Sequence, residues 1–593
     1  MTENILIKNI ITDGEFPIFL SGINHLEGGN VNYRHLNLVD NHEVKSYLDC
    51  LPAHIDEEQS MILGHTHVLA TAENDDFVTG LGLSSAVSDA HAFAAEGINT
   101  SSESTADADA DASAVGIDIA SKITTKEGND TIIGIGLAEA KADADAESAA
   151  KLSSNSVATA NAIANAIGIR NAGKIYAGEG NDTIIGIANV SASSTATASS
   201  QAESDSGNNL AVTANSESVA FVETSAIGIE NEGWIYTGKG HDIIVGVANN
   251  WTTSVAEAEA FAKNTVVMDR EHPVTIDQVE TAIATSTAAS TAINQTLTLG
   301  IVNSGLINTG NGHDVILGLA NNSSSSESLA DADAESTAQD FAAAIADASS
   351  LAGTESIAVG IANFGRIVTG KGDDTIIGIA VSNVNAVADA DADAFADANE
   401  PDAQTNTDTI ADTANGFAIG IDNTSGIIKT DLGNDQVIGY GEIGIQGGKI
   451  FTGKHNDRII AYGSKVGFQA GNVRLGNGHD YFQAAVVDFD PFTGHIEFAE
   501  DQSGSIQDAF VSGGRGNDNF ELGGFSTGVT IDGGQDHDVF KLWGSIDEYE
   551  ITLGSSEHQE LTIKNEDAIL TVKNVEAFYF GNSDHAYSYT DFA

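Results

Sequence analysis

The chain has very little cysteine, proline, tryptophan and positive charge. Its 593 residues include one cysteine, Cys50, with five prolines and three tryptophans. A lone cysteine cannot form an intramolecular disulfide, so any cross-link within this fold has to be of another kind, such as a metal ion. A chain of this length is also too long for one compact core, whereas a repeat array can grow without that limit.

Acidic residues outnumber basic residues by more than three to one. The chain has 24 Lys and Arg residues against 86 Asp and Glu residues, a formal net charge of −62. Two carboxylates about 5 Å apart repel each other by roughly 3 kcal/mol at an effective dielectric constant near 20. The charge therefore predicts that neither nucleic acid nor an anionic membrane is a partner, and it favours the binding of divalent cations.

Targeting, membrane and catalytic signals are missing from the sequence. Residues Met1–Ile11 have no basic start and no apolar run of signal-peptide length, and no stretch approaches the length of a transmembrane helix. The chain also has no H-E-x-x-H, no G-x-S-x-G and no phosphate-binding loop. We therefore predict no enzymatic activity and no membrane insertion, and the N-terminus by itself would predict a cytoplasmic protein.

A glycine-bracketed aspartate followed by apolar residues recurs eleven times along the chain. It closes a longer box, residues 166–188, which also holds an Asn-x-Gly turn and two β-branched runs. The box recurs at 226–248, 298–320 and 358–380. Two turn signals between short β-branched runs predict strand, corner, strand, corner, strand, which is one rung of a solenoid.

The spacing between the motif aspartates separates bare rungs from rungs with insertions. Asp435 and Asp457 are 22 residues apart, and Asp457 and Asp480 are 23 apart, whereas the upstream steps run from 52 to 72 residues. Subtracting one rung leaves insertions of about 30 to 50 residues, which we call arms. The sequence therefore predicts one rung type throughout, with arms added to the earlier rungs.

The arms alternate alanine with Asp, Glu, Ser or Thr, as in residues 138–147 and 386–398. On a strand, every alanine falls on one face and every acid on the other, whereas a helix would scatter the acids around its surface. A helix near residues 255–263 and 341–350 and disorder are the alternatives. Residues 183–205 and 210–231 are symmetric about a turn, which predicts a long hairpin with alanine faces packed together.

The glycine–aspartate motif resembles the RTX family of calcium-binding β-roll repeats, whose pattern is G-G-x-G-x-D-x-apolar-x. Only residues 513–520 fill the whole pattern, and Lys126 and His455 replace turn glycines in two copies. The resemblance implies an all-β, β-roll-like solenoid with Ca²⁺ held at one corner of each rung. It assigns calcium ligation to the motif aspartates and to the carbonyls of the turn glycines, namely Asp130, Asp182, Asp242, Asp314, Asp374, Asp435, Asp457, Asp480, Asp518 and Asp538, with Gly178, Gly180, Gly238, Gly240, Gly310, Gly312, Gly370, Gly372, Gly476, Gly478, Gly514 and Gly516.

One motif per rung predicts a single row of weak calcium sites rather than the double row of that family. Two alternatives to calcium stay open at this corner. The aspartate could cap backbone amides in a metal-free turn. Histidine precedes the aspartate at His241, His313, His479 and His537, so zinc is the second alternative, although His is also one of the residues best tolerated at unusual turn dihedrals.

Composition divides the chain into four regions. They are an N-terminal cap or leader at 1–70, rungs with long arms at 71–440, compact RTX-like rungs at 441–540 and a β-rich end at 541–593. In the last region the stretch Val575-Glu-Ala-Phe-Tyr-Phe580 resembles the C-terminal region of RTX proteins exported by type I secretion. That resemblance implies an extracellular or cell-surface protein exported without an N-terminal signal peptide.

These observations predict a secreted, calcium-binding structural protein of a bacterial surface layer, sheath, fibre or matrix. Calcium would drive its self-assembly, and its expected partners are further copies of itself and cell-surface polysaccharide. An adhesin or motility-related surface fibre is the alternative function. A polysaccharide-modifying enzyme is a further alternative, which the 24 basic residues spread along the sequence disfavour.

Overall fold

The structure is a computed structural model that describes residues 17–18, 36–37, 64–70, 75–94, 101–205, 211–266, 280–490, 495–554, 559–581 and 583–592. Most of the predicted N-terminal region 1–70 and the turn at 206–209 lie outside the described residues. The described part is built almost entirely of β-strands and contains no α-helix, which confirms the all-β prediction. The helical alternative for the arms is wrong, because residues 255–263 and 341–350 both lie within long strands.

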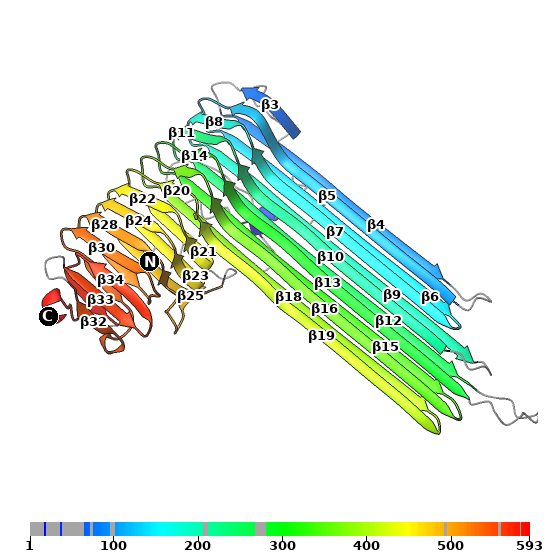
Figure 1. Cartoon of the computed structure of the whole chain (residues 1–593). Coiled ribbons are helices and arrows are strands. Elements are labelled where there is room, and N and C mark those ends of the chain that lie inside the picture. Colours follow the sequence, from blue (N-terminus) through cyan, green and yellow to red (C-terminus); the bar gives the residue numbers. More distant parts are fainter. Residues whose placement is uncertain are drawn as a thin grey trace, which may run out of the picture.

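The chain winds as a solenoid whose rungs each have three faces, and equivalent strands of successive rungs pair in parallel (Figure 1). We name the three stacks sheet A, sheet B and the short sheet. Sheet A contains β4 (Phe77–Ala94), β6 (Thr131–Ala150), β9 (Thr183–Asp205), β12 (Ile243–Thr265), β15 (Val315–Thr337), β18 (Thr375–Asp397), β21 (Gln436–Gln446), β23 (Arg458–Gln469), β25 (Tyr481–Asp490), β29 (Asn519–Leu522), β31 (Val539–Leu542) and β35 (Ala577–Phe580).

Sheet B contains β5 (Ser101–Thr124), β7 (Ser153–Asn171), β10 (Ala211–Asn231), β13 (Thr281–Asn303), β16 (Phe341–Asn363) and β19 (Glu400–Asp422), continued by the second halves of β21 and β23 and by β27 (Ile506–Gln507). The short sheet begins on β3 (Gly64–Ala70) and the end of β5 and continues through β8 (Lys174–Glu179), β11 (Trp234–Lys239), β14 (Leu306–Asn308), β17 (Arg366–Val368), β20 (Ile427–Lys429), β22 (Lys449–Lys454), β24 (Asn472–Asn477), β28 (Phe510–Arg515), β30 (Val529–Gln535) and β34 (Ala568–Lys573).

A few elements lie outside this stack. A two-stranded pair joins β1 (Pro17–Ile18) to β2 (Leu36–Asn37), and β26 (His495–Phe498) folds back on β25. At the C-terminal end β32 (Glu550–Leu553) pairs antiparallel with β33 (Glu560–Asn565), and β33 pairs antiparallel with β34, between the 3₁₀ turns Ile546–Glu548 and Tyr589–Phe592. The solenoid thus ends in a small antiparallel meander with aromatic packing around Phe578 and Phe580.

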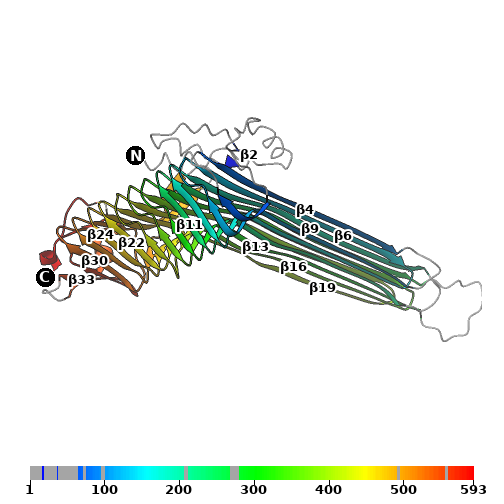
Figure 2. The same ribbon diagram turned by 90° about the horizontal axis from the view of Figure 1, so that it is seen from above.

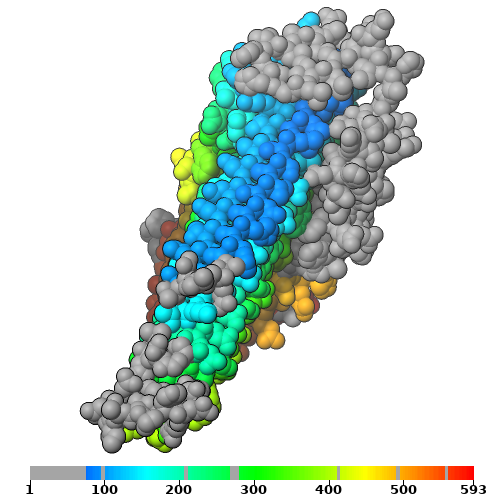
Figure 3. Space-filling view, turned by 90° about the vertical axis from the view of Figure 1, so that its right-hand side faces the viewer, coloured from blue at the N-terminus to red at the C-terminus, as the bar shows by residue number. Residues whose placement is uncertain are grey.

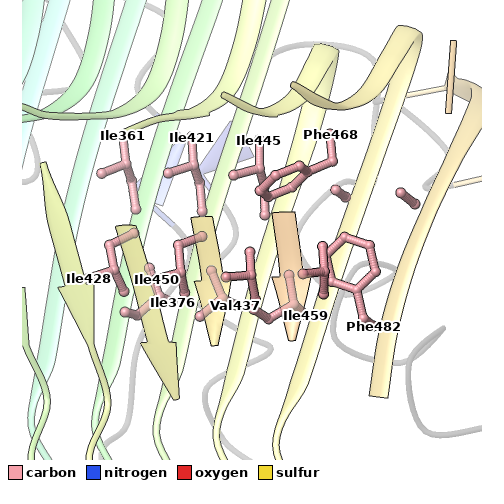
Figure 4. Close-up of a cluster of buried hydrophobic side chains, with 14 of the residues drawn as sticks. Ile361, Ile376, Ile421, Ile428, Val437, Ile445, Ile450, Ile459, Phe468 and Phe482 are labelled. Atoms are coloured by element: carbon pink, nitrogen blue, oxygen red, sulfur yellow. The ribbon is translucent and has the colours of Figure 1, made fainter. Parts of the chain in front are cut away.

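Branched aliphatic side chains fill the inside of the solenoid. Each rung contributes one from each face, such as Ile421, Ile428 and Val437, and all are fully buried (Figure 4). Phe468 and Phe482 take over in later rungs, where Figure 4 shows their rings in line with the isoleucine rows. Because every rung repeats the same three apolar positions, each side chain stacks on its equivalent above and below, so the core grows with each rung.

In the N-terminal half of the chain, the strands of sheets A and B extend beyond the solenoid. They run on into the arms without a break, and each long strand of up to 24 residues spans about 75 Å. The arms project together from one side of the solenoid as a slab of two sheets (Figure 2). This confirms strands in the arms, but the hairpin prediction is wrong. β9 pairs with β6 and β12, and β10 pairs with β7 and β13, so both edges of each strand are occupied by neighbouring rungs.

Alanine lies between the two sheets of the slab. Buried positions alternate strictly with outward ones along the arm strands, and alanines such as Ala144, Ala160 and Ala198 are at most 2% exposed. Serine takes some of these positions and hydrogen-bonds across the interface, as Ser154 Oγ does to the Ser148 carbonyl at 2.8 Å. Each arm is therefore an arch, whose two strands face each other through side chains rather than through backbone hydrogen bonds.

The slab ends in two open edges among the described strands. At one end β4 pairs only with β6, and residues 101–114 of β5 pair only with β7. Figure 3 views the slab with these first strands, coloured blue, toward the reader. At the other end residues 381–397 of β18 and 400–418 of β19 have one neighbour each, because the next rung has no arm.

Glycines hold the sheets together where the arms leave the solenoid. A Cβ on Gly186 would lie 2.1 Å from the carbonyl oxygen of Gly228, and a Cβ on Gly228 would lie 2.4 Å from the backbone nitrogen of Val247. The same contact recurs at Gly134 with Gly168 and in the later rungs. Sheets A and B thus touch backbone to backbone at this neck, which explains why each box carries a glycine within both of its apolar runs.

Candidate metal centre in the aspartate column

The ten predicted ligand aspartates lie in one column at the corner between the short sheet and sheet A. Each directly follows the glycine turn and directly precedes the first residue of a strand of sheet A, as Asp182 precedes Thr183 of β9. All ten side chains are at most 1% exposed. Asp76, whose motif has lost its glycines, is buried at the head of the same column.

One carboxylate oxygen of each aspartate bonds the rung before it. Asp314 Oδ1 accepts a hydrogen bond from the backbone N–H of Asp242 at 2.9 Å, and Asp374 Oδ1 accepts one from Asp314 at 2.9 Å. The chain of bonds runs unbroken from Asp76 to Asp538 at 2.8–2.9 Å, and the Asp538 N–H then donates to Glu576. A row of buried carboxylates is therefore a structural ladder along the whole solenoid.

The residue before each aspartate forms a second ladder in the opposite direction. The His241 N–H donates to Asn181 Oδ1 at 2.8 Å, and the His313 N–H donates to His241 Nδ1 at 3.0 Å. Asp373 and Asn434 continue the series. The residue before each column aspartate must therefore have a hydrogen-bond acceptor at its δ1 atom, which is Oδ1 in Asn and Asp and Nδ1 in His. Histidine here therefore has a role without zinc, and sequence reasoning missed this ladder although the restriction to Asn, Asp and His was its signal.

The other carboxylate oxygen, Oδ2, has no hydrogen-bond partner in the described part of the chain for any of the ten aspartates, and it is buried. In the last two turns it faces inward, because a Cβ on Gly513 or Gly533 would lie 2.2 or 2.6 Å from Oδ2 of Asp518 or Asp538. A buried acceptor without a partner costs free energy unless a proton or a cation satisfies it. The column repeats this unsatisfied oxygen ten times.

Burial raises the pKa of every carboxyl group in the column. A neighbouring threonine hydroxyl, present at six of the ten aspartates, and the backbone amides only partly offset the rise. The pKa is about 8 for Asp182, Asp374, Asp457 and Asp518, about 7 for Asp242 and Asp538, and about 6 for Asp314, Asp435 and Asp480, and it is raised from 3.8 for Asp130. In a metal-free column, several of these groups would therefore hold a proton at neutral pH.

The turn glycines are required by backbone conformation and by contact between rungs. All the predicted ligand glycines except Gly478 have φ between +96° and +156°, a region that residues with a Cβ rarely adopt. A Cβ on Gly240 would also lie 1.7 Å from the Gly180 carbonyl oxygen below it. The Gly238 and Gly310 carbonyls accept rung-to-rung hydrogen bonds from Asn311 and Lys371. These carbonyls therefore point along the stack, and a calcium ion would have to share them.

Replacing His455 with glycine is expected to stabilise the protein by about 1 kcal/mol, because His455 stands at a turn-glycine position with φ +83°. The measurement is the free energy of unfolding in denaturant. The control is Lys454→Gly, because Lys454 has no positive φ and glycine there should cost about 0.5–1 kcal/mol. Equal effects of the two changes would show that His455 is not strained.

The column fits calcium in the kind of atom that it offers. Its free Oδ2 atoms are hard, anionic oxygens in a row, and calcium accepts carboxylate, carbonyl and water oxygens in flexible geometry. No three His, Cys, Asp or Glu side chains converge on one point in the described residues, so a bound ion would combine the column aspartates with turn carbonyls and water. When bound, calcium would supply the positive charge that the buried carboxylates lack.

A third ladder stabilises the corner between sheet B and the short sheet. Asn171 Nδ2 donates to Asn231 Oδ1 at 2.7 Å, and the series continues through Asn303 and Asn363 to Asn423, all fully buried. Each of these donor amides also donates to the backbone carbonyl of the residue three or four positions after the equivalent asparagine of the next rung. Asn231, for example, donates to the carbonyl of Leu306, three residues after Asn303. The Asn-x-Gly of each box predicted a turn, and the structure adds that this asparagine links neighbouring rungs.

No protein-family model matches the chain, and neither a curated protein nor a solved structure is similar to it. Among the described residues, no helix is long and apolar enough to cross a membrane. The function therefore has to be argued from the column, the slab and the surface of this chain itself.

Proposed function

We propose that this chain is a secreted, calcium-loaded structural protein of a bacterial surface layer, sheath, fibre or matrix, with no catalytic activity of its own. The observation that carries the proposal is the continuous column of ten buried aspartates, each with one unused carboxylate oxygen. A column of this kind links every rung and cannot be neutral at high pH without cations. Calcium would therefore determine whether the whole solenoid is folded.

The composition and the slab support a structural role. The slab presents acidic side chains outward, as at Asp331 and Asp333, where burial and the neighbouring carboxylates raise the pKa. Its open edges offer unpaired backbone groups, along β4 and residues 101–114 at one end and along residues 381–397 and 400–418 at the other. An exposed edge strand is a template for pairing with another chain. Further copies of this chain are the partner proposed for these edges, with calcium offsetting the charge between them.

Secretion follows from the same chemistry in this proposal. Calcium is scarce inside cells and plentiful outside, so a fold that needs calcium would stay open during export and close afterwards. The C-terminal stretch that resembles type I-exported RTX proteins lies on β35, stacked on β31. The RTX relationship itself is part of the proposal, and it is supported by one glycine–aspartate turn per rung.

Replacing Asp374 with asparagine separates a calcium site from a metal-free turn. Asparagine keeps the acceptor for the Asp314 amide and removes the buried charge. We expect fewer bound calcium ions and a lower melting temperature in calcium, but a higher melting temperature in chelator, because the pKa of Asp374 is raised to about 8. Calorimetry and metal analysis measure these quantities.

The matched control is Asp373→Asn, which removes the same charge from the neighbouring exposed residue and keeps its acceptor for Asn434. It should change the calcium count and both melting temperatures little. A metal-free turn would be indicated if Asp374→Asn binds as much calcium as the unmodified protein and melts no lower in its presence.

Electron microscopy during calcium titration tests the assembly. We expect ordered fibres or sheets of the full chain above a threshold calcium concentration and dispersed particles in chelator. Ordered assemblies that form equally well in chelator would contradict a calcium-dependent scaffold, and particles that stay monomeric in calcium would contradict a polymer.

A further inference from the structure

Basic residues that are scattered along the sequence gather on one face of the solenoid. The outward positions of the short sheet form two straight columns from β5 to β30, because their strands pair in register. The first column holds Lys122, Lys174, Arg366 and Lys449, and the second holds Lys429 and Arg474. Residues that are spread along the sequence, which counted against an enzyme groove, are thus brought into line on one face.

A third column, at the turn beside them, runs from Glu127 to Gln535 and adds four more basic residues. The three columns, which we call the basic strip, thus carry ten of the 24 Lys and Arg residues of the chain. Their acidic members are only three, Glu127, Glu179 and Asp532, so ten positive minus three negative charges leave a net charge of +7. A positive surface on a chain of net charge −62 is a local inversion of charge.

Aromatic rings lie beside several of the cations in the basic strip. Lys174 Nζ lies 4.2 Å from the ring centre of Trp234, and Lys122 Nζ lies 4.8 Å from that of Tyr176. Trp234 is 49% exposed and Tyr236 is 40% exposed. A cation held over a ring face is attracted by the ring's electrons, so the lysines and rings of the strip stabilise one another's positions.

Several of the cations have no acidic partner within the described chain. Lys239 pairs with Glu179 and Lys429 pairs with Asp431, but Arg366 and Lys449 form no ion pair with any described residue. Unpaired charge that is held in a row on a rigid sheet is available to an external anion.

The shape of the strip selects a linear ligand. It is three side chains wide and about 40 Å long, since ten rungs follow one another at about 4.8 Å. A linear polymer with an anionic group and an apolar ring face in each unit can follow such a row, because its charges meet the cations and its rings stack on the aromatics.

We propose that the basic strip binds an acidic polysaccharide lengthwise along the solenoid. The preference for a polysaccharide over single-stranded nucleic acid rests on the extracellular role proposed above, because both are linear polyanions with ring faces. The strip lies on a different face from both sheets of the slab, so polymer binding and assembly through the slab edges can occur on the same molecule.

The test uses the full chain in calcium buffer with three probes, dextran sulfate, neutral dextran and oligodeoxythymidylate. Fluorescence titration is suitable because exposed Trp234 is one of three tryptophans. We expect binding to dextran sulfate that weakens with salt, no binding to neutral dextran, and at least tenfold weaker dextran sulfate binding by the double variant Lys174→Glu with Arg366→Glu.

The matched control is Lys141→Glu with Lys465→Glu, which changes the charge equally at exposed lysines outside the strip and should alter affinity less than twofold. Trp234→Ala is a second strip variant that leaves the charge unchanged, and it too should weaken binding. Circular dichroism with and without chelator tests the proposed role of calcium separately. An intact fold in chelator would contradict that role without contradicting polysaccharide binding by the strip.

Three results would overturn the strip proposal. They are equal loss of affinity in strip and control variants, tighter binding of oligodeoxythymidylate than of dextran sulfate, and a strip variant that alters self-association but not dextran sulfate binding. The last result would assign the strip to the acidic slab of a second copy.

Discussion

Removing calcium with a chelator is expected to lower the melting temperature by about 10 °C or more at pH 8 and by much less at pH 5. The reason is the aspartate column. At pH 8 its carboxyl groups, with pKa values of about 6 to 8, are largely ionised, buried and close to one another. In the calcium-loaded column proposed above, bound calcium would neutralise them, and chelation would leave these buried carboxylates uncompensated.

The sign of the pH effect follows from the raised pKa values. In the metal-free fold these groups hold protons up to pH 6–8, whereas in the unfolded chain they lose them near the ordinary value of 3.8. The fold binds more protons than the unfolded chain in this window, so metal-free stability is highest near or below pH 4 and is lost as pH rises through 6 to 8. Calcium bound in the proposed column would compete with these protons, so we expect its contribution to stability to grow over the same window.

Thermal melts at pH 5 and pH 8, each with calcium and with chelator, measure both effects, and magnesium at the same concentration is the control for ionic strength. Acidic side chains on the slab titrate as well, so a variant of the column is needed to identify its share. Asp374→Asn should reduce the difference between the melting temperatures at pH 5 and pH 8. Melting temperatures that do not respond to chelator at pH 8 would contradict calcium in the column.

Replacing Gly228 with alanine is expected to destabilise the fold by about 3 kcal/mol or more. The added Cβ would lie 2.4 Å from the Val247 nitrogen and 2.5 Å from the Gly300 carbonyl oxygen. Both neighbours are backbone atoms, so no side chain can rotate away, and sheets A and B would have to separate where the arms begin. Denaturant unfolding in calcium buffer gives the free energy.

The matched control is Gly353→Ala in β16, where an added Cβ meets nothing within 4 Å. Alanine there should be neutral or stabilise by up to about 1 kcal/mol, because glycine in a strand interior costs conformational entropy. If both alanine variants were equally stable, the sheets would not be in backbone contact at the neck.

Much of this architecture could be predicted because it depends on short-range patterns. The boxes at 166–188 and 226–248 hold two turns between apolar runs, and their period alone indicates stacked rungs. Alternation in the arms requires strands, because only a strand separates the alanines from the acids. The column aspartates follow from the spacing, since residues at the same place in each rung share one corner.

Pairing within the arms could not be predicted in this way. Residues 183–205 would alternate identically in a hairpin and in an arch, because side-chain period does not depend on which strand accepts the hydrogen bonds. In the structure, parallel stacking on β6 and β12 satisfies both edges of β9 and packs alanine against alanine. The direction of the two corner ladders was hidden for the same reason, since an acceptor at position 241 or 242 can serve the rung above or the rung below.

The sequence by itself determined the rung, the strands of the arms and the residues at each corner, because these depend on local periodicity and turn chemistry. Only the tertiary structure decided which strands pair, which carboxylate oxygen stays free and where the cations gather. These depend on what lies one rung away, 20 to 72 residues along the chain. Stacking in register turns single aspartates into a buried column and scattered lysines and arginines into a strip, and neither exists until neighbouring rungs align.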